Sequence, residues 1–201
     1  MRITRYIIYV LMIFTCQLVK SQSFSDPDNP WILGFGLNAI NDSGGGVKGL
    51  FNVSDNYNYS NPYRISVEKR FADHFGLEVA TNLNRFLEGK TVNGRSLEND
   101  IDFIALDGSV KFYFTNFFVD VNRSFIEGYM AMGAGKSFYD GTGAVLANVG
   151  FGVNYYVTEI FRLNTQVTSK FSTGAITNEL GSNYIQINIG FIIRIYKKSR
   201  I

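Results

Sequence analysis

Residues 63–84 read YRISVEKRFADHFGLEVATNLN, and their side chains alternate between apolar and polar along the chain. A period of two places alternate side chains on opposite faces of a β-strand. Only Ala72–His74 separates the two halves, so the stretch predicts a β-hairpin. The apolar face holds Ile65, Val67, Phe71, Phe75, Leu77, Val79 and Leu83, and the polar face holds Arg64, Ser66, Glu68, Arg70, Glu78, Asn82 and Asn84.

The same alternation recurs along the rest of the chain and defines eight segments, each close to the ~9 to 11 residues of a tilted membrane strand. Short connections at 72–74 and 158–160, with a less regular one at 114–124, alternate with longer ones at 41–62, 85–100, 136–143 and 172–183. This pattern predicts an all-β fold, an eight-stranded antiparallel up-and-down transmembrane β-barrel. The segments are residues 31–40, 63–71, 75–84, 101–114, 124–135, 144–157, 161–171 and 184–196.

The polar face of these segments carries charges of both signs, whereas the apolar face is rich in large Ile, Phe, Leu and Met side chains. An eight-stranded barrel has an interior only just wide enough for side chains. We therefore expect the bulky face to contact lipid and the charged face to line the lumen. Charges in a narrow, low-dielectric tube are costly unless they are paired, so we expect a structural network of ion pairs that fills the lumen. Its predicted members are Arg64, Glu68, Arg70, Glu78, Asp107, Lys111, Glu127, Arg162, Lys170 and Arg194.

Residues 1–23 have the layout of a secretory signal peptide, because two arginines precede a mostly apolar run that ends in small polar residues. The expected cleavage follows Ser21 or Ser23. Cys16 lies in the apolar run and is interpreted as a discarded apolar residue, with lipidation as the weaker alternative. We expect a lead-in at 24–30, the barrel at 31–196 and a short polar tail at 197–201. The mature chain then holds 16 basic and 17 acidic residues, so its overall charge gives no case for nucleic acid.

Residues 133–137 read GAGKS and resemble the end of a phosphate-binding loop. The loop pattern needs a glycine at position 130, where the chain has Met130, and a helix after Ser137, where no helical period follows. In the barrel, Gly133 and Gly135 would face the lumen and make space for bulky side chains. Lys136 would sit at the rim and begin the loop of residues 136–143.

Other candidate chemistry is sparse in the sequence. The single histidine, His74, falls in a predicted turn and is interpreted as a turn residue instead of a catalytic base. No calcium-loop pattern is present. An acid pair among the inward carboxylates is the weaker alternative to charge balancing. We therefore expect no catalytic residue, no metal and no cofactor.

The connection at 41–62 is rich in Gly, Asn, Ser and Tyr. Loops on rigid barrels often carry function, and tyrosines in a polar setting make binding surfaces. The alternative is a solvated loop with an aromatic belt at its ends. The sequence leaves both interpretations open.

Two stretches, NPWILGFGLNAIND at 29–42 and GFGVNYYVTEIFRLNTQVTSKF at 150–171, resemble the OmpA-type outer-membrane β-barrel domain, particularly as found in Bacteroidota-type bacteria. The resemblance covers about residues 30–196 and implies the bacterial outer membrane as the location. Asn188, Gly190, Ile193 and Ile195 are similar to the last-strand signal that the barrel assembly machinery reads, although the chain continues with YKKSRI. Relatives often continue into a peptidoglycan-binding domain, and that function cannot be transferred to this chain.

The leading hypothesis is a non-enzymatic outer-membrane barrel with a structural or protein-interaction role, acting alone or as a small subunit of a larger outer-membrane complex. Its expected partners are outer-membrane lipid, the barrel assembly machinery and other outer-membrane proteins. The alternatives are a narrow passive channel for small solutes and a lipid-modifying barrel enzyme.

Overall fold

A computed structural model describes residues 30–44, 52–118, 125–140, 142–158, 160–173 and 183–195. Within these residues eight long antiparallel strands form the barrel, and each pairs with the next along the chain. The last strand pairs with the first, from Trp31 opposite Ile195 to Asn41 opposite Ile185, so the sheet is closed. The predicted fold class is confirmed. The strands are β1 (Trp31–Asn41), β3 (Tyr63–Ala72), β4 (Phe75–Phe86), β7 (Ile101–Phe112), β8 (Ile126–Tyr139), β9 (Thr142–Tyr156), β10 (Phe161–Ser172) and β11 (Tyr184–Ile195).

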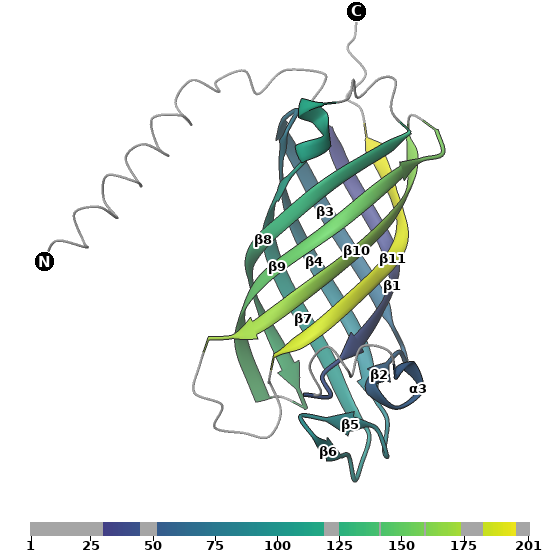
Figure 1. The fold of residues 1–201 in the computed structure, drawn as a ribbon, viewed down its shortest axis with the longest axis vertical. Helices are drawn as coiled ribbons and strands as arrows, with labels where there is room; N and C mark the ends of the chain where they lie inside the picture. Colours follow the sequence, from purple (N-terminus) through teal and green to yellow (C-terminus); the bar gives the residue numbers. More distant parts are fainter. Residues whose placement is uncertain are drawn as a thin grey trace, which may run out of the picture.

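The two ends of the barrel differ (Figure 1). We call the end with the β1–β3, β4–β7, β8–β9 and β10–β11 connections the loop end, and the other end the turn end. The loop end carries α3 (Val53–Asn56), β2 (Tyr57–Asn58) and the hairpin of β5 (Thr91–Val92) and β6 (Arg95–Ser96). The turn end carries the short β3–β4 turn and the 3-10 helix η1 (Phe114–Phe117).

None of the helices in the described residues combines the length and the apolar character needed to cross a membrane.

Several predicted strand boundaries are wrong by two residues or more; β4, for example, continues to Phe86 instead of ending at residue 84. The predicted loop at 136–143 is mostly strand, because β8 continues to Tyr139 and β9 begins at Thr142. The alternation continues through this stretch, since Ser137 and Tyr139 are buried while Lys136 is exposed. The chain turns at Asp140, which has a positive φ of 43°. Lys136 therefore lies inside β8, opposite Val145, and does not begin a loop.

At the turn end, β7 stops at Phe112, two residues before the predicted end of that segment. Tyr113 turns inward, where its hydroxyl donates to Glu68 Oε1 at 2.7 Å. Phe114 then starts η1 and its ring lies against Gly128. The strand thus ends where Tyr113 bonds to Glu68 in the lumen and η1 begins.

The predicted orientation of the two faces is confirmed. Leu77 and Phe151 are 51% and 58% exposed on the outside of the barrel, whereas Glu68 and Arg162 are 2% and 1% exposed in the lumen. Exposed large apolar side chains occur on all eight long strands. An apolar surface of this extent is unfavourable in water and matches the hydrocarbon of a bilayer. A closed sheet also satisfies its backbone hydrogen bonds without water.

Candidate functional site

The lumen of the barrel holds a continuous network of charged side chains, and Lys111 of β7 lies in its middle. The Lys111 ammonium lies 2.6 Å from Glu78 Oε2 and 3.0 Å from Glu68 Oε2. Both carboxylates come from the β3–β4 hairpin, where the two residues are directly opposite each other. Like charges at such a position repel, and the Lys111 ammonium between the two carboxylates offsets this repulsion.

From Glu68 the network continues toward the turn end. Arg70 Nε lies 3.0 Å from Glu68 Oε1, and Arg70 Nη2 lies 2.8 Å from Glu127 Oε2. Arg162 Nη1 reaches the same Glu127 oxygen at 3.0 Å. The Arg70 guanidinium also stacks 3.3 Å from the ring centroid of Tyr113, a cation–π contact. Strands β3, β8 and β10 are thereby connected through their side chains.

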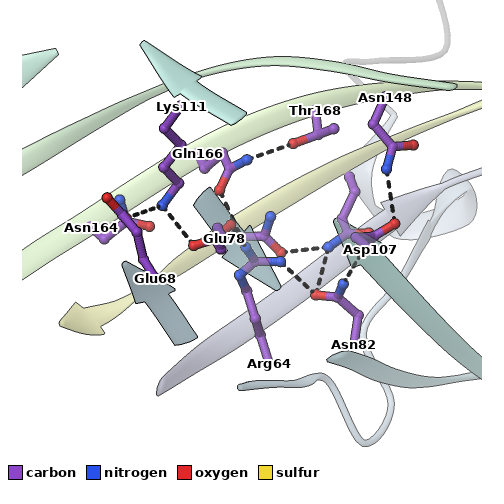
Figure 2. A network of polar contacts seen from close by, with 12 residues as sticks. Arg64, Glu68, Glu78, Asn82, Asp107, Lys111, Asn148, Asn164, Gln166 and Thr168 are labelled. Atoms are coloured by element: carbon purple, nitrogen blue, oxygen red, sulfur yellow. Dashed lines mark hydrogen bonds and ion pairs between the residues drawn. The ribbon is translucent and has the colours of Figure 1, made fainter. Parts of the chain in front are cut away.

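From Glu78 the network continues toward the loop end (Figure 2). Arg64 Nη2 lies 2.8 Å from Glu78 Oε1, and Arg64 Nη1 donates to Asn82 Oδ1 at 3.1 Å. Asn82 Nδ2 then donates to Asp107 Oδ2 at 2.9 Å. Lys170 ends the chain of contacts, with its Nζ 2.8 and 2.6 Å from the two carboxylate oxygens of Asp107.

The ten residues predicted for this network are not equivalent. Arg194 is only partly buried, near the turn end of β11. The other nine are buried in the lumen and are joined by the contacts above: Arg64, Glu68, Arg70, Glu78, Asp107, Lys111, Glu127, Arg162 and Lys170.

Side-chain amides and hydroxyls satisfy further hydrogen-bonding capacity of the buried ions. Asn148 donates to Asp107 at 2.9 Å and Asn154 to Glu127 at 3.0 Å. Among the described residues, the Nε and Nη2 atoms of Arg162 have no hydrogen-bond partner. Buried ion pairs of this kind often contribute little net stability, but removing one partner leaves an uncompensated charge. The network therefore favours strand arrangements in which each buried charge of the lumen keeps a partner.

A hydrophobic cluster built around four aromatic rings, which we call the loop-end cap, closes the lumen between the charge network and the loop end. The Phe103 ring lies 5.3 Å from Phe86, 5.1 Å from Tyr139 and 5.8 Å from Tyr184, centroid to centroid. Val92 packs against the cluster from the β5–β6 hairpin. The sequence analysis did not identify this cap, although Phe86 and Phe103 lie in register with the inward Asn84 and Ala105. The members are Ile40, Phe86, Val92, Phe103, Ala105, Tyr139, Leu146 and Tyr184.

Two small cavities lie among the described side chains of the lumen. One cavity of about 20 Å³ lies between Arg64, Glu78, Asp107 and Lys170. Another of about 10 Å³ lies beside Ser66, Asn164 and Asn188. A single water needs roughly 10 to 15 Å³, so each of these cavities has room for about one water.

The glycines of the GAGKS stretch are explained by close packing. A Cβ at Gly133 would collide with the carbonyl oxygen of Gly108, and one at Gly135 with Asp107 Oδ1. Ser137 is followed by two more residues of strand β8 and not by a helix. The stretch is thus part of the barrel wall, without the strand, loop and helix arrangement of a nucleotide site.

His74 lies in the β3–β4 turn, where its ring is 3.9 Å from that of Phe117. It is at the turn end and packs against an aromatic side chain. In the part of the chain that the structure describes, no three His, Cys, Asp or Glu residues are grouped so as to hold a metal ion.

Parts of the β1–β3 and β4–β7 connections contact each other at the loop end, and we call residues 52–62 and 87–100 the loop platform. The β5–β6 turn is tied to the end of β1, because Asn93 N donates to Asp42 O at 2.6 Å and Gly94 N to Ser43 O at 3.0 Å. Lys90 joins the two halves of the platform, since its ammonium donates to Ser54 O and lies 5.4 Å from the Tyr59 ring centroid. The described residues 52–62 of the 41–62 connection therefore contact the neighbouring connection.

One carboxyl of the platform has a perturbed pKa. Asn52 Nδ2 donates to Asp55 Oδ2 at 2.9 Å and Ser54 Oγ to Asp55 Oδ1 at 2.8 Å. These two hydrogen bonds, the first being the larger effect, lower the pKa of the Asp55 carboxyl below its ordinary value.

The four residues of the proposed assembly signal lie on β11, at the seam that closes the barrel. Gly190 is opposite Gly36 of β1, and a Cβ at Gly190 would collide with the carbonyl oxygen of Phe35. Asn188 is buried in the lumen, while Ile195 is exposed near the turn end. The close packing of β1 and β11 therefore also explains why position 190 is a glycine.

Comparison with known proteins identifies the fold. No protein-family model and no curated protein matches the chain. Among solved structures, Neisserial surface protein A matches with a TM-score of 0.56 at 13% identity, over 83% of this chain and 97% of that one. OprG from Pseudomonas aeruginosa matches with a TM-score of 0.54 at 15% identity, over 84% and 97%. The N-terminal β-barrel domain of Pseudomonas aeruginosa OprF gives 0.53 at 11%, over 84% and 98%.

These similarities show the fold: the chain has the same closed β-barrel architecture as these three outer-membrane proteins.

Proposed function

We propose that the chain is a non-enzymatic outer-membrane β-barrel with a structural or protein-interaction role, in which the barrel is a rigid support and the loop platform is the contact surface. The observation that carries the proposal is the filled lumen. The nine buried charged side chains of the network and the loop-end cap occupy it, and each of the two cavities described above has room for about one water. A barrel filled in this way presents only its surfaces to other molecules.

The loop platform supports an interaction role. Backbone hydrogen bonds join its β5–β6 turn to Asp42 and Ser43, which follow β1, and the contacts of Lys90 join its two halves. It nevertheless presents apolar side chains, since Val53 and Tyr59 are 57% and 56% exposed. A preorganised surface with exposed aromatic and aliphatic groups loses little conformational entropy on binding. The proposed partner is another outer-membrane protein, and the barrel is then a small subunit of a larger complex.

The non-enzymatic assignment is supported by how the carboxylates are used. Glu68, Glu78, Asp107 and Glu127 each contact at least one buried cation. An acid or base for catalysis must reach a proton of its substrate, whereas these groups are enclosed and paired.

The finer family assignment is also a proposal. We infer an OmpA-type barrel of the Bacteroidota kind from the two stretches at 29–42 and 150–171, and recognition of β11 by the barrel assembly machinery from Asn188, Gly190, Ile193 and Ile195. The position of β11 as the closing strand supports the second inference.

Co-purification in a mild detergent tests the interaction role. The native chain is expected to elute in a complex, and the double variant Val53→Ser with Tyr59→Ser is expected to elute alone. Phe118→Ser is the matched control, because Phe118 is 85% exposed but lies at the turn end. Retention of the complex by the platform variant, or its loss in the control, would contradict the assignment to the platform.

Planar-bilayer recording tests the filled lumen against the channel alternative. The proposal predicts no discrete conductance from the inserted barrel. Steps of constant size in the native protein would show that a continuous water path exists, and a transport role would replace the proposed one.

A further inference from the structure

Lys136 is an unusual residue for the outer face of this barrel. It points outward from β8, and its two register neighbours, Leu106 of β7 and Val145 of β9, are exposed apolar residues. By contrast Arg85, on the outer face of β4, is paired with Asp102 at 2.7 Å. Within the described residues Lys136 forms no ion pair. An unpaired ammonium among lipid-facing side chains is costly unless it reaches a polar group.

The local structure directs the lysine side chain toward the loop end. Gly143 of β9 is opposite Phe138, closer to the loop end than Val145. A Cβ on Gly143 would lie 2.7 Å from Lys136 Cε and 3.4 Å from the Phe138 ring carbons. The Lys136 ammonium lies 5.0 Å from the Phe138 ring centroid. The absence of a side chain at Gly143 therefore provides the path along which the lysine extends.

Gly143 is not required by its backbone. Its φ is not in the positive range that favours glycine, unlike that of Gly89 or Gly94. Glycine at this position leaves room for the aliphatic part of the Lys136 side chain. Long cationic side chains lay this part along an apolar surface and place the charged group at the membrane interface.

The depth of Lys136 fits the headgroup region. The turn residue Asp140 is four positions beyond it, with residues 137–139 between them. At ~3.4 Å per residue along a strand tilted by ~45°, this places its backbone roughly 10 Å from the end of the strand, measured along the barrel axis. The extended side chain then carries the ammonium to the boundary between hydrocarbon and headgroups.

We propose that Lys136, with Phe138 and Gly143, forms a binding site for the phosphate group of an anionic lipid in the leaflet at the loop end. An ammonium is a compact point charge with three donors, suited to a phosphate oxygen. The Phe138 ring shields one side of the charge. The lysine of the GAGKS stretch thus binds phosphate on a lipid and not on a nucleotide.

The surface next to Lys136 has room for an acyl chain. Gly108, Ala134 and Ala147 form one outward row across β7, β8 and β9, one step further into the membrane than Lys136. A Cβ at Gly108 would meet no heavy atom within 4 Å, so the outer surface is open there. Larger side chains flank the row at Leu106 and Val110.

Native mass spectrometry of the folded full-length chain, titrated with dioleoyl phosphatidylglycerol, tests the site. The native barrel is expected to retain one phosphatidylglycerol saturably, in preference to an uncharged diacylglycerol without phosphate. Lys136→Gln is expected to weaken this binding about fivefold, the effect of removing one lysine at an anionic surface. Lys136→Arg keeps the charge and is expected to bind within about twofold of the native chain.

Gly143→Val tests the direction of the Lys136 side chain separately from its charge. It keeps Lys136 but occupies the space of its aliphatic part, and it is expected to weaken binding as Lys136→Gln does. Lys69→Gln is the control, since Lys69 lies over Trp31 at the turn end. Unchanged binding in Lys136→Gln would overturn the proposal, and so would equal loss in Lys69→Gln. Displacement of the lipid by millimolar inorganic phosphate would assign the site to a free anion and overturn the lipid assignment.

This inference rests on the proposed membrane location, and the two fail differently. A native chain that does not insert into vesicles would contradict both. Variants and native chain that all insert, show heat-modifiable gel mobility and bind both lipids equally would contradict the lipid site alone.

Discussion

Lys170 of β10 reaches across the lumen to Asp107 of β7, with its Nζ 2.6 and 2.8 Å from the two carboxylate oxygens. The two strands are not neighbours, because β8 and β9 lie between them in the sheet. Both residues are buried. The contact can form only when the sheet is curved into a closed barrel, so it connects lumen chemistry to the global fold.

Removing one member of this pair should be strongly destabilising. Asp107→Ala leaves the Lys170 ammonium buried without its carboxylate and is expected to cost about 3 to 5 kcal/mol of unfolding free energy. The double variant with Lys170→Met removes the uncompensated charge and should recover a large part of that loss. Urea unfolding of the vesicle-inserted protein measures both.

The exposed Arg85–Asp102 pair is the matched control, since its N–O distance of 2.7 Å lies between the two Lys170–Asp107 distances. Asp102→Ala is expected to cost about 0 to 1 kcal/mol, because solvent-exposed pairs are weak. Similar losses in Asp102→Ala and Asp107→Ala would show that burial does not determine the strength of these contacts.

The two glycines Gly133 and Gly108 should respond oppositely to alanine. They lie on adjacent strands β8 and β7, one facing inward and the other outward. Gly133→Ala places a methyl group against the Gly108 carbonyl and should cost about 1 to 3 kcal/mol or prevent folding. Gly108→Ala meets open space and should change stability by about 0.5 kcal/mol or less. The fraction of heat-modifiable barrel on a gel, with the urea midpoint, compares them.

The loop-end cap should contribute to stability as a packed core does. Phe103 is 1% exposed within three aromatic contacts, so Phe103→Ala is expected to cost about 3 to 5 kcal/mol through the cavity it leaves. Phe118→Ala, at an exposed site of the turn end, should change stability by about 0.5 kcal/mol or less. Equal effects of the two substitutions would mean that the cap is loosely packed.

Much of the barrel follows from sequence because strand geometry has a strict period of two. Once Arg64 and Glu68 share a face with Arg70, the lumen side of β3 is determined, and the same holds for Asp107 and Lys111 on β7. The short β3–β4 turn at Asp73 and His74 was predictable from the few residues between the two alternating runs.

The pairing within the lumen was not predictable in the same way. Asp107 contacts Lys170 and not the nearer-in-sequence Lys111, because contacts across the lumen depend on the stagger of the strands around the closed barrel. Which lumen residues pair is determined by how the barrel closes, and the alternation within a single strand does not predict this.

The loop-end cap was missed, and Lys136 was misplaced, for a different reason. The predicted segment 75–84 ended before Phe86 and the segment 124–135 ended before Lys136, while Phe103, inside the segment 101–114, was assigned to neither face. Aromatic residues occur on both faces near a strand end, and hydrophobicity alone does not separate a cap from a membrane belt.

Tryptophan fluorescence in bilayers of brominated phosphatidylcholine tests the central claim, that the apolar face meets lipid and the ionic face lines the lumen. With Trp31, the only tryptophan, replaced by Phe, Phe151→Trp should be strongly quenched by bromines on the acyl chains. Tyr129→Trp should remain unquenched, because Tyr129 is fully buried in the lumen. Strong quenching at position 129 with little at position 151 would contradict the account.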